Sequence, residues 1–182
     1  GAPVYLSLRI IRNKYNFILN KNNTKNTMHY EPPKLFLEGI WKGKGRVIGS
    51  LDYDEELEFT KIKPDVYFYR QKTSNADKGP LHSEVGYIRV FKEANQPEGK
   101  IELAVSHPFG VAEISEGTFT DSKATLKTAS IARTSSAIAP YVTVLTRVFY
   151  LKDGDTLTYT VDMGTSTKEE CPHLEGELKR TK

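Results

Sequence analysis

The chain is poor in thiols and in long apolar runs. It has one cysteine among 182 residues, Cys171, which excludes a framework of intramolecular disulfides. It has no Cys-x-x-Cys pair, so a structural zinc site of the usual spacing is excluded as well. The most apolar segments have the length of strands and fall far short of the roughly 20 residues of a membrane helix. These absences predict a soluble protein of a reducing compartment, the cytoplasm or alternatively the nucleus.

An excess of one charge is also lacking. The chain has 26 lysines and arginines and 23 aspartates and glutamates, a formal net charge of +3. Five of the basic residues lie before residue 31, in a stretch without acids, so the rest carries 21 basic and 23 acidic residues. There the two signs are interleaved, whereas a surface that follows a phosphate backbone gathers basic residues. We therefore expect no nucleic-acid binding by the main body of the chain.

Residues 1–31 differ in composition from the rest. They are rich in asparagine and lysine, a composition that cannot bury enough apolar surface to fold alone. Leu8, Ile11, Tyr15 and Ile18 have rough helical spacing beside arginines, so a transit peptide or a docking helix is the alternative. We expect a poorly ordered or loosely packed N-terminal extension, followed by one domain over residues 32–182.

Beyond residue 32 the chain lacks long amphipathic helices. Residues 33–38 are expected to form a short helical turn, with proline at its start and Gly39 just after its end. The later segments are short, rich in β-branched and aromatic residues, and often alternate between apolar and polar positions. About ten strands are expected, over residues 46–48, 56–62, 66–72, 82–92, 100–105, 110–119, 124–132, 142–151, 156–163 and 175–179.

The segments that join the expected strands have turn chemistry. Residues 75–80, 95–99 and 152–155 combine glycine with asparagine, aspartate or proline, as hairpin turns do. Successive hairpins build an antiparallel meander, and closing it removes the exposed strand edges. Side chains alone cannot fill a barrel of about ten strands. The prediction is an all-β, lipocalin-like, up-and-down β-barrel with an internal cavity for a small molecule.

The candidate site residues are histidines and one methionine. Alternation along residues 156–163 places Met163 on the apolar face, where it either fills the core or lines a pocket for a flat apolar ligand. His82 and His107 are each expected near a barrel rim, as site residues or as ordinary surface histidines. No role is assigned to His29, which lies in the N-terminal extension.

His173 has the most restricted setting of the four histidines. Pro172 precedes it and fixes the backbone, so the imidazole is expected at the start of the terminal strand. Closing the barrel pairs this strand with the first one, which holds Trp41 among alternating glycines. We therefore expect His173 near Trp41, whose indole is expected to plug one end of the barrel.

Four motifs occur in order over about four-fifths of the chain. They are Gly39-Ile40-Trp41-Lys42-Gly43-Lys44-Gly45; His82-Ser83-Glu84-Val85-Gly86-Tyr87; Gly110 with Glu113 and Gly117-Thr118-Phe119; and Met163 followed by Pro172-His173-Leu174. The first is similar to a G-x-W-x-G-x-G opening and the second to an H-x-E-x-G-Y strand. Together they resemble the nitrobindins, heme-binding β-barrels that also form the C-terminal domain of certain THAP proteins.

The resemblance implies a ten-stranded barrel that holds one heme b near an open end. His173 matches the family's proximal iron ligand and is the implied catalytic and metal-binding residue. His82 matches a pocket histidine or propionate-side contact, and Met163 a pocket methionine, with Trp41 as a second residue that shapes the pocket. His107 departs from the pattern, where a polar residue other than histidine is usual, and is expected as a distal or rim contact or as a second iron ligand.

The implied activities are nitric oxide binding and isomerisation of peroxynitrite to nitrate. A ferric iron with an open site suits both, since nitric oxide needs no distal donor and ferric iron can act as a Lewis acid toward peroxynitrite. The expected partners are therefore small molecules: heme, nitric oxide and peroxynitrite. No membrane partner is expected, and the sequence leaves open whether the barrel forms a homodimer.

Three alternatives remain at this stage. Cys171 has a rival claim to the iron, because a Cys-Pro pair can bind heme through the thiolate. The barrel could instead carry a fatty acid or another apolar ligand without catalysis, in which case a buried arginine should face the ligand's carboxylate. Arg70, Arg89 and Arg147 are the candidates for that role. The third alternative is a module that senses nitric oxide and passes its state to a partner.

Overall fold

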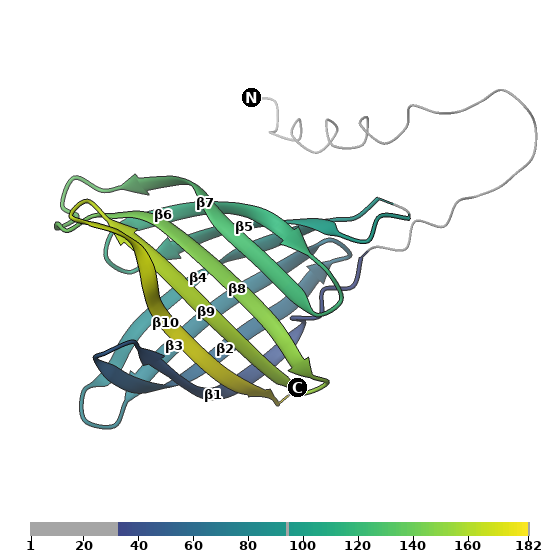
Figure 1. The fold of residues 1–182 in the computed structure, drawn as a ribbon, viewed down its shortest axis with the longest axis horizontal. Coiled ribbons are helices and arrows are strands. Elements are labelled where there is room, and N and C mark those ends of the chain that lie inside the picture. Colours follow the sequence, from purple (N-terminus) through teal and green to yellow (C-terminus); the bar gives the residue numbers. More distant parts are fainter. Residues whose placement is uncertain (1–32, 94, 182) are drawn as a thin grey trace, which may run out of the picture. The chain divides into compact units, whose positions relative to one another are not determined.

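A computed structural model describes residues 33–93 and 95–181, which form a closed antiparallel β-barrel (Figure 1). Each strand pairs with the next along the chain and β10 pairs with β1, so the predicted ten-stranded up-and-down barrel is confirmed. The strands are β1 (Gly39–Val47), β2 (Leu51–Lys63), β3 (Val66–Asn75), β4 (Gly79–Phe91), β5 (Gly99–His107), β6 (Val111–Phe119), β7 (Lys123–Arg133), β8 (Val142–Asp153), β9 (Thr156–Thr165) and β10 (Lys168–Arg180). The expected N-terminal extension lies outside the described residues.

The expected helical turn at residues 33–38 is wrong. The segment makes a single turn in which the Glu38 amide donates to the Leu35 carbonyl at 3.1 Å. The Leu35 amide donates instead to the Tyr67 hydroxyl at 3.3 Å, a contact with the barrel rather than within a helix. Leu35, Phe36 and Leu37 are all buried, which one helical face cannot achieve for three consecutive residues. Among the residues that the structure covers, no helix has the length and hydrophobicity needed to cross a membrane.

One end of the barrel, here called the closed end, is filled by apolar side chains around Trp41. The indole is fully buried and donates to the Leu37 carbonyl at 2.8 Å. The Arg180 guanidinium lies 4.0 Å from its ring centroid, a favourable cation–π contact. Other buried side chains of this core are Leu57, Phe59, Tyr67, Ile88, Val90, Ile101, Phe119, Leu126 and Leu157. Trp41 therefore plugs one end of the barrel.

The other end, here called the mouth, is framed by the loops that follow β1, β3, β5, β7 and β9. The β1–β10 register pairs Trp41 with Arg180 but Val47 with Leu174. Six residue steps of extended strand, roughly 20 Å, therefore separate the level of Trp41 from that of Leu174. The expectation that closure brings His173 near Trp41 is wrong, because in an antiparallel pair the start of one strand faces the end of its partner.

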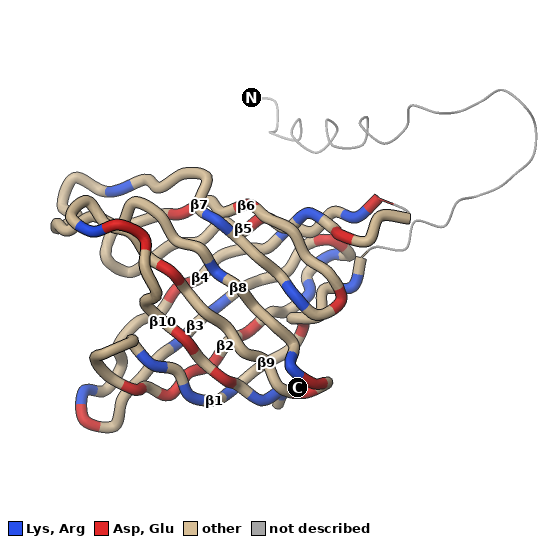
Figure 2. The backbone as a smooth tube through the Cα atoms, in the orientation of Figure 1, with Lys and Arg blue, Asp and Glu red and all other residues tan. Residues whose placement is uncertain are grey.

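Basic and acidic residues are interleaved along the strands of the barrel (Figure 2). Opposite charges pair across neighbouring strands, as Lys42 does with Glu56 at 3.0 Å and Arg46 with Asp52 at 3.4 Å. These pairs are exposed on at least one side, so each adds about 1 kcal/mol at most. The barrel wall is thus polar outside, while the alternate residues turn inward.

Inward-facing glycines at the β1–β10 seam make room for two tyrosines. Gly45 pairs with Gly176, and their other neighbours are Tyr53 on β2 and Tyr159 on β9. A Cβ at Gly45 would lie 2.6 Å from Tyr53 Cζ, and one at Gly176 would lie 2.9 Å from Tyr159 Cζ. The two hydroxyls are 2.7 Å apart, and Tyr159 donates to Glu55 at 2.6 Å. The glycines thereby allow a hydrogen-bonded chain to end on a buried carboxylate.

Glu55 is the acceptor of that chain and is only 4% exposed. Burial raises the pKa of Glu55 to about 7, although hydrogen bonds from Tyr159 and Gln71 partly offset the burial. Because the carboxylate is more basic in the folded protein than in the unfolded chain, ionising it destabilises the fold.

Substituting Gly43, which faces Leu178 across the seam, tests the closure of the barrel. A Cβ there would meet the Glu177 carbonyl oxygen and lie 2.7 Å from the Leu178 Cα, so the backbone must move. We expect Gly43→Ala to lower the free energy of unfolding by roughly 1–3 kcal/mol in chemical denaturation. Gly154→Ala is the matched control, since no atom lies within 4 Å of its added Cβ. Equal stabilities of the two variants would contradict the tight seam.

Glu55→Gln tests the buried carboxylate. The stability that Glu55 contributes in its protonated form is complete below its unfolded pKa, near 4.5, and is lost as the pH rises through its folded pKa of about 7. Glutamine does not titrate, so the variant keeps the contribution that the parent loses. Relative to the parent, its free energy of unfolding should rise by about 3 kcal/mol between pH 4.5 and pH 8. Denaturation curves across this range measure the difference, and a difference that is constant with pH would refute the assignment.

Candidate functional site

The mouth carries exposed apolar side chains on its loops. Ile48, Phe109 and Tyr141 are partly exposed, and Ile138 is 87% exposed. The β5–β6 and β7–β8 loops line a cavity of about 500 Å³, whose walls include Phe109, Val111, Ile138, Tyr141 and Val142. Concave apolar surface at a barrel mouth is a common setting for small-molecule binding.

His173 lies at this mouth, in a β-bulge of β10. Pro172 pairs with Asp162 and Leu174 pairs with Val161, so His173 is the extra residue without a partner on β9. Proline cannot donate to the ladder, which is why a bulge forms beside it. On the other side, the His173 carbonyl accepts from the Ile48 amide at 2.9 Å. The sequence predicts His173 at the start of the last strand. Because β10 begins at Lys168, His173 lies inside the strand instead.

The His173 ring in this bulge is half-buried, which affects its protonation. Burial lowers the pKa of His173, and the nearby Lys168 ammonium lowers it further. The shift has no contribution from a hydrogen bond with the described residues. At neutral pH the ring is therefore an uncharged imidazole, the form that binds metals. Bulges are frequent beside active sites because they redirect a side chain.

Met163 lies on the neighbouring strand β9, across from Cys171 on one side and Leu145 on the other. It is half-buried against the core. The Cys171 thiol lies 3.9 Å from the Met163 carbonyl, within the range for a thiol donor. Cys171 pairs with Met163 and Leu174 pairs with Val161, so the bulge interrupts the regular alternation of faces between residues 171 and 174. Residues 171 and 173 therefore cannot be assigned to the same face by alternation.

Below the mouth, the barrel contains a buried ion-pair network centred on Arg147. Its guanidinium contacts Glu84 at 3.4 Å and also pairs with Glu113. The three charged groups belong to β8, β4 and β6, which are not adjacent in the barrel. Tyr69 donates to Glu84 at 2.6 Å, and Ser115 donates to Glu113.

The network keeps both carboxylates ionised. Burial alone would raise their pKa values, but Arg147 and the hydrogen-bond donors around them outweigh it. The pKa of Glu113 falls to about 2 and that of Glu84 falls further below its usual range. Arg147 is thus the buried arginine that a carrier would need, but two glutamates already balance its charge. Arg70 and Arg89 do not serve either, because they pair with glutamates at the partly exposed outer surface.

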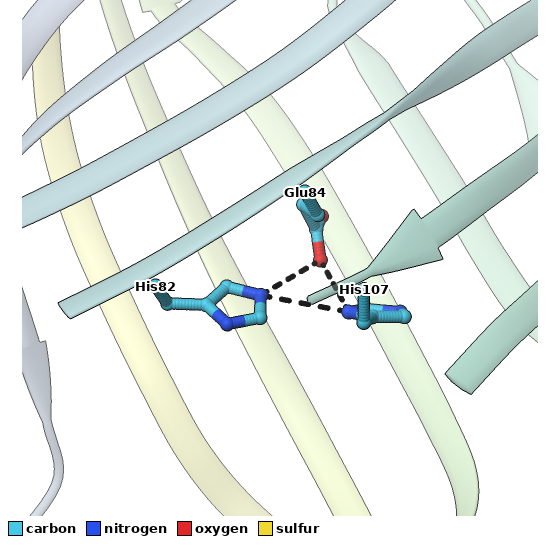
Figure 3. A group of neighbouring side chains, drawn as sticks. All are labelled: His82, Glu84 and His107. Carbon is cyan, nitrogen blue, oxygen red and sulfur yellow. Dashed lines mark hydrogen bonds and ion pairs between the residues drawn. The ribbon is translucent and has the colours of Figure 1, made fainter. Parts of the chain in front are cut away.

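His82, Glu84 and His107 converge at the top of this network (Figure 3). His107 Nδ1 lies 3.2 Å from Glu84 Oε2, and its Nε2 lies 3.3 Å from Glu113 Oε2. His82 Nε2 lies 3.4 Å from the same Glu84 oxygen and 3.5 Å from His107 Nδ1. The Phe109 ring lies 5.4 Å from the His107 ring and 5.7 Å from the His82 ring. Both histidines therefore belong to one cluster beneath an exposed aromatic ring.

The structure thus sorts the predicted site residues into three places. His173 and Met163 lie on adjacent strands at the mouth, His82 and His107 form the cluster with Glu84, and Trp41 lies at the closed end. No role was predicted for Glu84, Glu113, Tyr69 or Ser115 from the sequence. A signal existed for two of them: Glu84 is two residues from His82, and Glu113 alternates with Val111, so both occupy inward positions of their strands.

Comparisons with known proteins agree with this architecture. The sequence model of the THAP4-like, heme-binding β-barrel domain matches residues 32–180. Peroxynitrite isomerase 1 of Mycolicibacterium paratuberculosis is 39% identical over 153 residues, covering 79% of this chain and 90% of the relative. A peroxynitrite isomerase of Arabidopsis thaliana is 33% identical, covering 81% and 87%.

Among solved structures, the crystal structure of Rv2717c from M. tuberculosis is similar with a TM-score of 0.66 and 33% identity. The match covers 81% of this chain and 94% of that one. The residues that the family model matches span all ten strands of the described barrel. This chain belongs to the family of THAP4-like, heme-binding β-barrel domains.

Proposed function

We propose that this chain binds heme b at the mouth of the barrel, with His173 as the axial ligand, and isomerises peroxynitrite to nitrate. The observation that supports it most is the setting of His173, a half-buried, uncharged imidazole in a β-bulge at the mouth of the barrel. Relatives that are 33–39% identical bear the name peroxynitrite isomerase, which supports the activity.

The residues at the mouth fit a flat apolar cofactor with an iron centre. Met163 and the exposed apolar side chains of the mouth loops offer contact to the ring, and His173 offers a neutral nitrogen ligand. When bound, heme supplies a Lewis-acidic iron that binds nitric oxide and polarises the oxygens of peroxynitrite. His173 would hold the iron, and Lys168 adds positive charge beside it, which favours the approach of an anion.

The other predicted contacts take narrower roles. Both ring nitrogens of His107 face carboxylates, so no role as an iron ligand is proposed for it. His82 directs Nε2 into its cluster, which leaves Nδ1 for a cofactor contact. Trp41 supports the site only by closing the far end of the barrel. Cys171 directs its thiol at a carbonyl, so a protonated thiol is expected in place of a thiolate ligand.

Titrating the heme-free protein with ferric heme tests the cofactor assignment. We expect one heme per chain and a sharp Soret band, because a fixed imidazole gives a single coordination state. His173→Ala should lose the sharp band, while Cys171→Ser, the control for the rival ligand, should keep it. A carrier would bind its ligand regardless of His173, so an unchanged titration of His173→Ala would contradict the proposed site.

Catalysis is tested separately, by mixing peroxynitrite with the heme-loaded protein in a stopped-flow instrument. We expect faster decay than with the same concentration of free heme, and nitrate in place of nitrite as the dominant product. The heme-free protein should show no acceleration, since the chain supplies no other Lewis acid in this proposal. Decay no faster than with free heme would refute the isomerase function while leaving heme binding intact.

A further inference from the structure

The cluster of His82, Glu84 and His107 has the composition and the size of a metal site. It offers two imidazole nitrogens and one carboxylate oxygen, all within 4.8 Å of one another. We propose that these three residues bind a divalent transition-metal ion of the Zn²⁺ class, at a site separate from the heme iron. This site does not include His173, and metal binding there does not depend on heme or on the proposed activity.

The three ligand atoms are spaced as in a zinc site. The three ligand atoms form a triangle with sides of 3.2, 3.4 and 3.5 Å. Zn²⁺ binds imidazole nitrogen and carboxylate oxygen tetrahedrally at about 2.0–2.1 Å, which places neighbouring ligand atoms roughly 3.3 Å apart. The triangle (Figure 3) therefore matches one face of a zinc tetrahedron without movement of any side chain.

The carboxylates around His107 give a second argument. Its two ring nitrogens face Glu84 and Glu113, both of which are buried. In an uncharged imidazole one ring nitrogen has no hydrogen, and its lone pair would here point at a carboxylate oxygen. Arg147 balances only one of the two negative charges. The two carboxylates and the one guanidinium leave a net negative charge that attracts a cation, and a metal ion at Nδ1 would lie between that nitrogen and Glu84.

The surrounding hydrogen bonds support the same assignment. With its hydrogen on Nε2, His107 donates to Glu113 and keeps the lone pair of Nδ1 toward the cluster. A carboxylate behind a ligating histidine is the usual support of a metal site. On the other side, Tyr69 donates to Glu84 Oε1 and so directs Oε2 at the two histidines. The ligands are thus oriented before any ion is bound.

The position of the cluster gives an ion access and leaves room for a further ligand. The side chains of Glu84 and His107 are only 4% and 5% exposed, but that of His82 is 32% exposed and faces the rim. Three protein ligands are the number found in zinc sites that keep a fourth position for water or substrate. The structure thus assigns a second, accessible metal site to the mouth.

Cobalt titration of the heme-free chain is the experiment that tests this site. Co²⁺ replaces Zn²⁺ in such sites and absorbs visible light when tetrahedral. We expect one Co²⁺ per chain, a visible band, and loss of that band when Zn²⁺ is added. His82→Gln and His107→Gln should each abolish it, Glu113→Gln should weaken the affinity about 10–100-fold, and His173→Ala should leave it unchanged.

A second measurement keeps the test decisive if a variant fails to fold. In the parent protein, NMR of the imidazole nitrogens should show Zn²⁺ shifting the resonances of His82 and His107 but not those of His173. Absence of a cobalt band in the parent, or a band that persists in folded His107→Gln, would overturn the proposal. So would an NMR spectrum in which His107 is an imidazolium at neutral pH and Zn²⁺ has no effect, because a proton would then supply the missing charge.

Discussion

The interior of this barrel depends on one buried guanidinium. Arg147 joins Glu84 and Glu113 across the lumen, so side chains from three strands that are not neighbours meet at one level. Removing one member of a buried pair costs about 3–5 kcal/mol, because the charge left behind has no partner. This level separates the apolar closed end around Trp41 from the mouth.

The same side chain has different chemistry in two places at that mouth. His173 lies in a bulge beside a lysine, without a carboxylate, and its pKa is lowered, so it is a neutral ligand. His107 lies between two buried carboxylates, with one ring nitrogen facing each of them. The environment, and not the residue type, separates an imidazole that suits an iron porphyrin from one that suits a bare cation or a proton.

The sequence predicted what depends on local patterns. Alternation and turn residues extend over only a few positions, and from them the number of strands and the hairpins were predicted. The cost of exposed strand edges then predicted that the sheet closes into a barrel. Two errors had different origins. The placement of His173 beside Trp41 ignored the direction of antiparallel pairing, which the sequence already implied. The bulge was missed as well, although Pro172, which cannot donate to the ladder, was a signal for an irregularity in this strand. The pairing of Arg147 with two glutamates could not be predicted, since alternation gives the face of a strand but not the residue across the lumen.

His107 shows how a departure from a family pattern can be more informative than agreement with it. The resemblance that identified the barrel also indicated that a histidine at this position is unusual. His82 and Glu84 belong to a matching motif, and on their own they supply two ligands, too few for a closed or catalytic zinc site. His107 adds the third ligand at 3.2–3.5 Å from the other two, and Glu113 is already in place behind it. His107 is therefore the residue that turns the pair of His82 and Glu84 into a candidate metal centre.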